Sequence, residues 1–220
     1  MSLVVVKDVT KTYRLGTQTV VALADVSLDV QAGEFLAVAG PSGSGKTTLL
    51  NLVGCLDTPT SGQIEIDGEA VATLSSGRRA DLRARKLGFI FQTFNLIPVL
   101  TAWENVEYPL LLTKRGGNGA RVRAALEQVG LGDRARHRPP ELSGGQQQRV
   151  AIARALVTEP ALVLADEPTA NLDSRTGHEI VELMRRLNRE RQTTFVFSTH
   201  DPRIMSAADR VLEISDGRLR

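Results

Sequence analysis

The feature that most constrains the fold is a glycine-rich run set between an apolar segment and a helical one. Residues Gly40–Thr47 read GPSGSGKT and fit the pattern G-x-x-x-x-G-K-[ST]. The apolar run Phe35–Ala39 predicts a buried strand before it, and Lys46–Leu56 predicts a helix after it. A plain Gly/Ser-rich turn would not need all eight positions and both flanks. The run therefore predicts a P-loop, which holds phosphate on backbone N–H groups at the positive end of a helix dipole.

The residue types within this loop suit a nucleoside triphosphate. Gly43 and Gly45 let the backbone wrap a phosphate without Cβ clashes. Lys46 is expected to reach the β- and γ-phosphates, and the Thr47 hydroxyl is expected to bind Mg²⁺. The nucleotide-binding residues predicted in this segment are Gly40, Pro41, Ser42, Gly43, Ser44, Gly45, Lys46, Thr47 and Thr48.

A second chemical signal is a pair of carboxylates at the end of a predicted buried strand. Asp166 and Glu167 follow the apolar run Ala161–Ala165, and ligands of such sheets bind at the carboxyl ends of strands. Because successive side chains on a strand point in opposite directions, Asp166 is expected to face Mg²⁺ while Glu167 reaches the attacking water. Glu167 is thus the candidate general base or water-positioning residue. The alternative is a helix N-cap followed by an acidic first turn.

A second glycine-flanked hydroxyl lies far downstream, in the sequence Leu142–Gln146. Alone, Ser143 would be an ordinary helix N-cap. Beside a P-loop, it predicts a second phosphate seat that cannot serve the same phosphate. Two seats suggest a head-to-tail dimer in which each copy closes over the other's ATP, so the residues predicted to bind nucleotide in trans are Ser143, Gly144, Gly145 and Gln146.

Three further side chains are candidates because of where their segments end. His200 follows the predicted strand Thr193–Ser198 and is expected to contact the γ-phosphate. Gln92 follows Leu87–Phe91, where an amide can coordinate Mg²⁺ and move between two lobes. Tyr13 can stack on adenine, with a core or edge tyrosine as the alternative. The predicted catalytic residues are Lys46, Glu167 and His200, and the predicted metal ligands are Thr47, Gln92 and Asp166.

Alternation of strands and helices predicts the architecture. Strands followed by helices indicate a largely parallel sheet with both faces covered, and residues from about 98 to 158 show a helical pattern interrupted at 116–119 and at Pro139-Pro140. We expect an α/β P-loop NTPase with a mostly parallel sheet core, an N-terminal antiparallel β part and an inserted helical subdomain. The chain is predicted to be one domain, residues 1–220, with a core lobe of 1–92 and 159–220 and a helical lobe of 93–158.

Composition narrows the possible partners and compartment. The net charge is +2, and the basic stretch Arg78–Lys86 is interrupted by Asp81 and lacks aromatics, so we expect a solvated helix face and no nucleic-acid partner. The single cysteine, Cys55, fits a reducing compartment and is expected to be a buried thiol on the helix after the P-loop. No apolar run reaches membrane-spanning length, and the N-terminus lacks a signal-peptide pattern. The sequence therefore predicts a cytoplasmic protein.

Together these motifs resemble those of the ATP-binding-cassette (ABC) ATPases over essentially the whole chain. In that family's terms the matches are Tyr13 (A-loop), Gly40–Thr47 (Walker A), Gln92 (Q-loop), Leu142–Gln146 (signature), Asp166 and Glu167 (Walker B), Ala170–Asp173 (D-loop) and His200 (switch). No motif is degenerate, so the resemblance implies an active ATPase. It also implies Mg²⁺, a dimer around two ATP in which Asp173 takes part in communication, and membrane permease subunits that dock around Gln92–Leu112. The chain would then lie on the inner face of the membrane through its permease.

A narrower likeness concerns residues 54–62, 100–106 and 164–173, which are similar to bacterial LolD- and MacB-type cassettes for lipoprotein release and macrolide export. Ala170 departs from the family's usual glycine before the D-loop asparagine. An alternative function is a division-type regulatory cassette that signals through a permease-like partner without moving substrate. DNA-repair cassettes, ribosome-acting cassettes and nucleoside-type kinases fit less well, because they carry a long coiled coil, two cassettes in one chain, or no signature motif.

Overall fold

The computed structural model describes residues 2–113 and 119–220, and over these residues the strands form two sheets. The strands of the larger sheet have the order β10-β9-β3-β8-β7-β6, and β9, β3, β8, β7 and β6 run parallel. Their bounds are β3 (Phe35–Ala39), β6 (Leu87–Ile90), β7 (Leu162–Asp166), β8 (Thr194–Thr199), β9 (Arg210–Ser215) and β10 (Arg218–Leu219). The predicted α/β fold with a mostly parallel sheet is confirmed.

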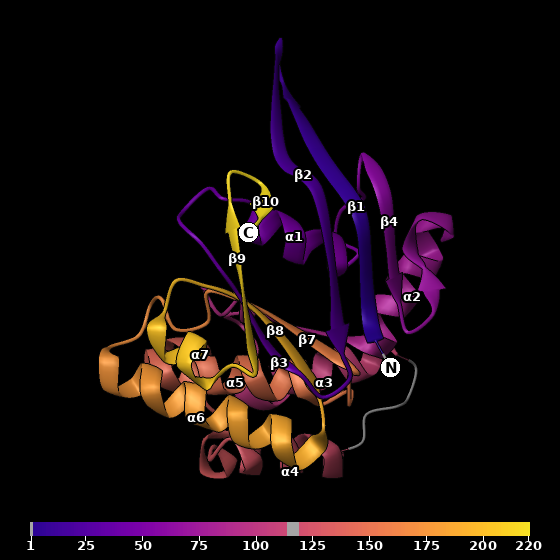
Figure 1. Cartoon of the computed structure of the whole chain (residues 1–220). Coiled ribbons are helices and arrows are strands. Elements are labelled where there is room, and N and C mark those ends of the chain that lie inside the picture. Colours follow the sequence, from indigo (N-terminus) through magenta and orange to yellow (C-terminus); the bar gives the residue numbers. More distant parts are fainter. Residues whose placement is uncertain (1, 114–118) are drawn as a thin grey trace.

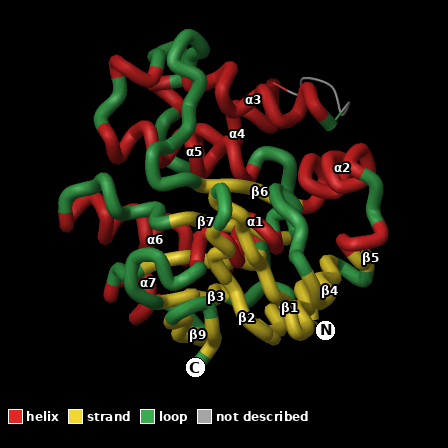
Figure 2. Tube along the Cα trace, turned by 90° about the horizontal axis from the view of Figure 1, so that it is seen from above, coloured by secondary structure: helices red, strands yellow, loops and turns green. Residues whose placement is uncertain are grey.

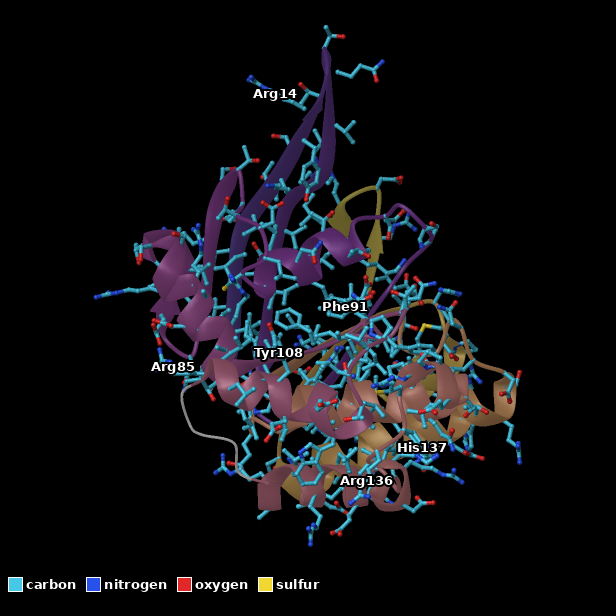
Figure 3. All side chains as sticks on the ribbon, turned by 180° about the vertical axis from the view of Figure 1, so that it is seen from behind. Arg14, Arg85, Phe91, Tyr108, Arg136 and His137 are labelled. Atoms are coloured by element: carbon cyan, nitrogen blue, oxygen red, sulfur yellow. The ribbon has the colours of Figure 1, made fainter. Side chains whose placement is uncertain are left out.

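The smaller sheet is antiparallel and has the order β2-β1-β4-β5. Its strands are β1 (Ser2–Leu15), β2 (Gln18–Gln31), β4 (Ser61–Ile66) and β5 (Glu69–Ala70). The apolar runs Val4–Val9 and Val20–Val30 predict two shorter strands. The observed strands are longer, since they stay paired to the tight turn at Gly16 and form a hairpin that projects from the body (Figure 1). Arg14 points into solvent near the tip of that hairpin (Figure 3).

The larger sheet separates two hydrophobic cores because its strands are apolar on both faces. In β3, Phe35 and Ala37 belong to one core, and Leu36 and Val38 belong to the other, as the period-two alternation of a strand requires. The first core packs against α3 (Ala102–Leu112), α4 (Gly119–Gln128), α5 (Gly144–Leu156), α6 (Ser174–Arg191) and α7 (Pro202–Ala207). The second lies against the antiparallel sheet, α1 (Lys46–Val53) and α2 (Ser76–Lys86).

The helical block lies between two neighbouring strands of the parallel sheet. The chain leaves β6 at the sheet edge, forms α3, α4 and α5 with two 3₁₀ turns at Gly132–Arg134 and Pro139–Glu141, and returns in the adjacent strand β7. Seen from above, α3, α4 and α5 gather on the side of β6 away from the antiparallel sheet (Figure 2). This arrangement explains how a helical lobe can be inserted without interrupting the order of the sheet.

The predicted end of the helix after the P-loop needs correction, and the predicted break at 116–119 falls largely outside the described residues. The helix after the P-loop ends at Val53 rather than at Leu56, because Gly54 caps it and Cys55 has a left-handed backbone with φ of 54°. Cys55 is buried as expected, but it lies in the turn after α1 and not on the helix. Most of the predicted break at 116–119 falls on 114–118, outside the described residues. Among the helices that the structure describes, none is both long and apolar enough to cross a bilayer.

Candidate active site

A cavity of about 660 Å³ opens at the carboxyl ends of β3, β7 and β8. This is the edge where ligands of parallel sheets bind. It brings together predicted residues that are far apart in the sequence. The lining residues are Val20, Val21, Ala22, Pro41, Ser42, Gly43, Gly45, Lys46, Thr47, Thr48, Gln92, Glu167, Ala170 and His200.

The P-loop connects β3 to α1 as the sequence predicts. Gly45 precedes the helix with φ of 108°, and a Cβ there would lie 2.6 Å from the Ala22 carbonyl oxygen, so the position requires glycine. No side chain caps the start of α1. The buried Lys46 ammonium donates to the carbonyl oxygens of Gly40 (2.8 Å) and Pro41 (2.9 Å). The loop thus presents uncapped backbone N–H groups and a buried cation, which suits a polyphosphate.

Side-chain oxygen atoms from the start of α1 and from the ends of β7 and β8 lie close together next to the P-loop. The Thr47 hydroxyl lies 3.1 and 3.3 Å from the two carboxylate oxygens of Asp166, and the Ser198 hydroxyl donates to the same carboxylate. Among the described residues no group of three or more His, Cys, Asp or Glu side chains is arranged to hold a metal ion by itself. One carboxylate, a hydroxyl and the nearby Gln92 amide suit Mg²⁺, which binds few protein ligands and completes its shell with water and phosphate. The donor set therefore fits the predicted ion.

Glu167 lies at the centre of a charged group at the end of β7. Its Oε1 is 2.9 Å from His200 Nδ1 and 3.9 Å from Lys46 Nζ. Its backbone has φ of 45°, and its N–H donates to the Ser198 carbonyl oxygen at 3.0 Å. A left-handed backbone is uncommon for a glutamate and is held here by the neighbouring strand. The three predicted catalytic residues thus lie together in one chain.

The loop after Glu167 is tied to three other elements by contacts that the sequence did not suggest. The buried Gln148 amide on α5 donates to the Pro168 carbonyl oxygen at 2.6 Å, and its Oε1 has no partner among the described residues. The Thr169 hydroxyl donates to Asp201, and the Asn171 amide donates to the Gln92 carbonyl oxygen at 3.0 Å. The segment that follows Glu167 is therefore hydrogen-bonded to α5, to Asp201 beside His200, and to the backbone of Gln92.

Asp201 follows the candidate histidine, and its carboxylate accepts several hydrogen bonds. It accepts from Arg203 Nε at 2.9 Å and Nη2 at 2.6 Å and from the Thr169 hydroxyl. Burial by itself would raise the pKa of Asp201, but the hydrogen bonds from Arg203 and Thr169 outweigh it and lower the pKa to about 2. The sequence did not single out Asp201, whose partners are Thr169 in the loop after β7 and Arg203 on α7.

The Q-loop backbone is held by Arg154, another residue that the sequence did not single out. Phe94 and Asn95 both have left-handed backbones, with φ of 62° and 48°. Arg154 on α5 donates to the carbonyl oxygens of both residues, at 2.8 Å for Phe94. Burial lowers the pKa of its guanidinium. Gln92 lines the cavity, so this half-buried cation fixes the segment that joins the cavity to the helical lobe.

The second predicted phosphate seat is absent from the lining of this cavity. Ser143 caps α5 by accepting from the Gln146 N–H at 3.3 Å, and the Gln146 side chain accepts from the Ser143 N–H at 2.9 Å. Asp173 likewise caps α6, and its hydrogen bonds with Thr176 lower its pKa. Within a single chain, Ser143, Gly144, Gly145 and Gln146 do not join the P-loop residues. Their predicted role in trans, and that of Asp173 in dimer communication, stay predictions.

Tyr13 lies beside the cavity but is not among the residues that line it. It pairs with Val20 across the β1–β2 ladder, and Val20 lines the cavity. The Tyr13 hydroxyl donates to Asp57 at 2.9 Å. The ring is half-buried, so the structure places the predicted adenine-stacking residue next to the cavity mouth.

Comparison with protein families identifies one match, and it covers the motifs described above. The model described as "ABC transporter" matches residues 23–170. This range holds the P-loop, the Gln92 segment, the Ser143 helix and the Asp166–Glu167 pair. Tyr13 and His200 lie outside it.

Curated relatives resemble the chain over nearly its whole length. It is 50% identical to the lipoprotein-releasing system ATP-binding protein LolD of Bordetella pertussis, covering 96% of this chain and 92% of that protein. It is also 50% identical to the macrolide export ATP-binding/permease protein MacB of Syntrophobacter fumaroxidans, covering 99% of this chain. The chain spans only 31% of that MacB protein.

Solved structures agree with the fold. A dimeric post-hydrolysis state of the ATP-binding cassette MJ0796, bound to ADP and Pi, superposes with a TM-score of 0.91 at 46% identity, covering 99% of this chain and 96% of that one. A second dimeric structure of MJ0796, described as a bacterial ABC transporter cassette, has the same TM-score and coverage. The curated MJ0796 protein of Methanocaldococcus jannaschii is 48% identical to this chain.

Proposed function

This chain belongs to the ABC transporter family and is its ATP-binding, ATP-hydrolysing subunit, and from this premise we propose that the cavity between the P-loop and the ends of β7 and β8 is where ATP is bound and cleaved. The observation that carries the proposal is the meeting of Lys46, Glu167 and His200 at one edge of the sheet, with Oε1 of Glu167 as their common contact. Phosphoryl transfer depends mainly on positioning and charge stabilisation, and this group supplies both.

Each residue of this group has a distinct task in the hydrolysis of ATP to ADP and phosphate. Glu167 orients the attacking water and accepts its proton. His200, 2.9 Å from that carboxylate, holds Glu167 and contacts the γ-phosphate. The Lys46 ammonium leaves the Gly40 and Pro41 carbonyls for the β- and γ-phosphate oxygens, whose growing negative charge it stabilises.

Thr47, Asp166 and Gln92 are the residues that would hold Mg²⁺. The ion would neutralise charge on the β- and γ-phosphates. We expect two copies of this chain to contribute residues to each nucleotide site. Ser143 and the first N–H groups of α5 in one copy would complete the site of the other, because the N-terminus of a helix attracts anions and these residues lie outside the cavity of their own chain.

Substitution of the candidate base tests this assignment. Glu167→Gln keeps the size of the side chain but removes the proton acceptor, so we expect kcat to fall by about 10²- to 10⁴-fold while ATP binding persists. With hydrolysis blocked, ATP should hold two copies together as a dimer visible by size-exclusion chromatography. ATP hydrolysis at a near wild-type rate would remove Glu167 from its proposed role. An Asp81→Asn variant, on the exposed face of α2, is the matched control.

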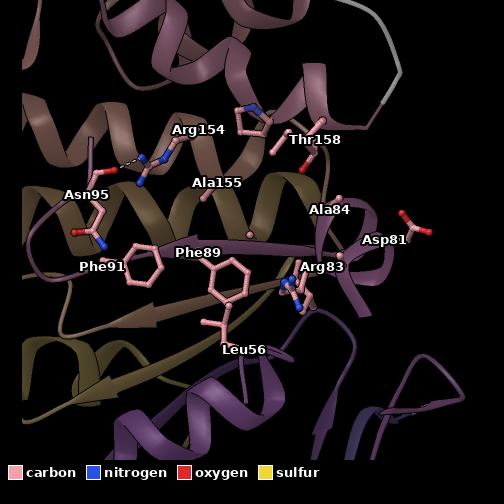
Figure 4. Close-up of a pocket in the computed structure, with 15 residues that line it drawn as sticks. Leu56, Asp81, Arg83, Ala84, Phe89, Phe91, Asn95, Arg154, Ala155 and Thr158 are labelled. Atoms are coloured by element: carbon pink, nitrogen blue, oxygen red, sulfur yellow. Dashed lines mark hydrogen bonds between the residues drawn. The ribbon is translucent and has the colours of Figure 1, made fainter. Parts of the chain in front are cut away.

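A groove at the boundary of the two lobes is the proposed docking site for a permease helix. Figure 4 shows this hollow of about 540 Å³, where Phe89, Phe91 and Leu56 form an apolar floor beside Asn95 and Arg154. Leu56 and Leu112, which both line it, are 50% and 62% exposed. Exposed apolar side chains around a hollow are typical of interaction sites. The groove also borders the Asn95 segment held by Arg154, so a docked helix would press on the loop that carries Gln92.

Charge placed in the groove tests this docking site. Leu56→Glu with Leu112→Glu should reduce co-purification with the co-expressed permease at least about tenfold, since each buried carboxylate opposes desolvation. The ATPase rate of the isolated chain should stay within about twofold. Val211→Glu is the matched control, because Val211 is exposed on β9. Equal permease recovery by both proteins would exclude this groove as the docking surface.

Transport of the type performed by LolD or MacB systems is the proposed cellular role. LolD is named for lipoprotein release and MacB for macrolide export, and a division-type regulator is not favoured by these relatives. A membrane position on the cytoplasmic side would follow from the permease partner. Identification of the membrane protein that co-purifies with this chain distinguishes the lipoprotein, macrolide and regulatory systems.

A further inference from the structure

A charged cluster outside the catalytic group connects Tyr13 to the loop after α1. Lys11 and Tyr13 lie two residues apart on β1 and therefore on the same face of the strand. Asp57 bridges them, because one carboxylate oxygen accepts from Lys11 Nζ at 2.8 Å and the other accepts from the Tyr13 hydroxyl at 2.9 Å. Lys11 also donates to the Thr58 carbonyl oxygen at 2.8 Å.

The cluster fixes the Tyr13 ring at both its edge and one face. Asp57 holds the hydroxyl, and the Lys11 ammonium lies over the ring at 4.8 Å from its centroid, an attractive arrangement. The ring is nevertheless half-exposed beside Val20, which lines the ATP cavity. A ring restrained in this way loses less conformational freedom when a planar ligand stacks on it.

The loop that carries Asp57 is also hydrogen-bonded to the strand that carries Tyr13. The Thr60 hydroxyl accepts from the Thr12 N–H at 3.0 Å, and the Thr60 N–H donates to the Thr10 carbonyl oxygen at 2.9 Å. This loop follows α1, the helix that begins in the P-loop and lies close to β2 and β4 (Figure 1). The position of the ring is therefore set relative to the phosphate-binding helix.

The protonation states of the pair suit this geometry. Burial would raise the pKa of Asp57, but the hydrogen bonds from Lys11 and Thr58 outweigh it and hold the pKa below its usual range. Burial, followed by the contact with Asp57, raises the pKa of Tyr13. Near neutral pH the carboxylate is ionised and the phenol is protonated, so the phenol donates to the carboxylate as a charge-assisted hydrogen bond.

We propose that Asp57 is a positioning residue for ATP, whose carboxylate, together with Lys11, fixes the Tyr13 ring as a platform for the adenine base. The proposal rests on the adenine-stacking part of the proposed function. It assigns to Asp57 a part of the affinity that depends on the base and none that depends on the phosphates. A carboxylate that only ties a loop to β1 would instead affect every ligand of the P-loop alike.

Calorimetric titration with ATP and with inorganic triphosphate, which has no base, separates these two roles. Asp57→Asn and Tyr13→Phe should each weaken ATP binding three- to tenfold and leave triphosphate binding unchanged. The double variant should bind ATP no more weakly than Asp57→Asn alone, because Tyr13→Phe removes only the hydrogen bond to Asp57 that Asp57→Asn already disrupts. Asp25→Asn is the matched control. Asp25 accepts a hydrogen bond from the Thr10 hydroxyl on the strand that carries Tyr13, but among the described residues it makes no hydrogen bond to Tyr13.

The outcomes distinguish the proposal from its premise. Equal weakening of ATP and triphosphate by Asp57→Asn, or additive losses in the double variant, would overturn the positioning role. Tyr13→Ala supplies the second readout: if it weakens ATP binding while Asp57→Asn does not, stacking stands and the role of Asp57 fails. If Tyr13→Ala leaves ATP affinity unchanged, adenine stacking itself fails, whatever Asp57 does. Melting temperatures of all variants verify that each chain is folded.

Discussion

The two helix starts that were predicted as phosphate seats differ in how they satisfy their own N–H groups. At α1, Gly45 precedes the helix and no side chain caps it. At α5, Ser143 and Gln146 form a reciprocal capping box. Both sequences contain glycines and a hydroxyl, but only the first leaves its helix N-terminus free of side-chain hydrogen bonds.

This difference suggests that the two seats bind phosphate in different ways. A phosphate can bind at α1 without displacing any side-chain cap, so the P-loop of one chain is free to accept a nucleotide. The capping box at α5 satisfies the first N–H groups of that helix in the isolated chain, so in the proposed dimer a phosphate from another copy would compete with it or share its N–H groups. If the proposed role of Ser143 in trans is right, the uncapped first seat would favour tight binding and the capped second seat a contact that forms and breaks in each cycle.

Disruption of the second seat should produce the largest effect. Ser143→Arg places a bulky cation at the start of α5, and we expect hydrolysis to fall by at least about 10³-fold, as for loss of other groups supplied in trans. ATP binding to the isolated chain, measured by equilibrium dialysis, should persist. Introduced into the Glu167→Gln background, it should abolish the ATP-dependent dimer.

The matched control for this change is Ser75→Arg, because Ser75 caps α2 in the same way, by accepting from the Arg78 N–H. Both variants lose a cap, which costs about 1 kcal/mol of stability. Only the Ser143 variant should lose hydrolysis. Loss of ATP binding by the isolated Ser143→Arg chain would show that both seats serve one nucleotide in the same chain.

Loss of the hydrogen bond from Gln148 on α5 to Pro168, in the loop after Glu167, should have an intermediate effect on kcat. Gln148→Leu removes the hydrogen bond to Pro168 and also the partnerless Oε1, so the two changes offset each other and the free energy of unfolding should change by less than about 1 kcal/mol. If Gln148 transmits the position of α5 to Glu167, kcat should still fall about tenfold. Urea unfolding and steady-state ATPase assays measure the two quantities.

Gln147→Leu is the control for this pair, because the Gln147 amide donates to Leu142 and not to the catalytic loop. It should retain near wild-type kcat. A parallel loss of stability and activity in Gln148→Leu would reduce Gln148 to a packing residue, and the two seats would then be independent within the chain.

The last expected effect is one on stability and concerns Asp201, the carboxylate that binds Arg203 and Thr169. Its pKa of about 2 in the folded chain lies below its value in an unfolded chain, so its contribution to stability is present above about pH 4 and is lost as the pH falls towards 2. Asp201→Asn should lower the free energy of unfolding at pH 7 by about 1–3 kcal/mol. Urea unfolding between pH 7 and pH 3 should show the gap from wild type narrowing with acid, whereas a constant gap would contradict the assignment.

Much of the fold was predictable because it depends on local patterns. The strand Phe35–Ala39 was predicted with its observed bounds, since an apolar run before a P-loop has one consistent interpretation. The long hairpin was underestimated at both strands because polar, exposed strand ends carry no alternation signal. Lys46–Leu56 was predicted too long because the left-handed turn at Cys55 has no signature in a non-glycine residue.

The candidate site also contains residues that local sequence patterns predicted and residues that they did not. Residues such as Lys46, Asp166 and Glu167 were found because phosphate and metal chemistry demands fixed residue types at strand ends. Gln148, Arg154 and Asp57 were missed. Their hydrogen bonds reach Pro168, Phe94 and Tyr13, and no pattern along the chain indicates which polar side chain will meet which distant carbonyl or hydroxyl.

The amino-acid sequence by itself determined the P-loop, the parallel sheet and the residue types available for ATP chemistry, because short-range periodicity and motif spacing encode them. Only the tertiary structure decided that Ser143 lies outside the cavity of its own chain and that Asp57 holds Tyr13. Those relations join segments distant in sequence, and they are set by how the two sheets and the helical lobe pack, which local preferences do not specify.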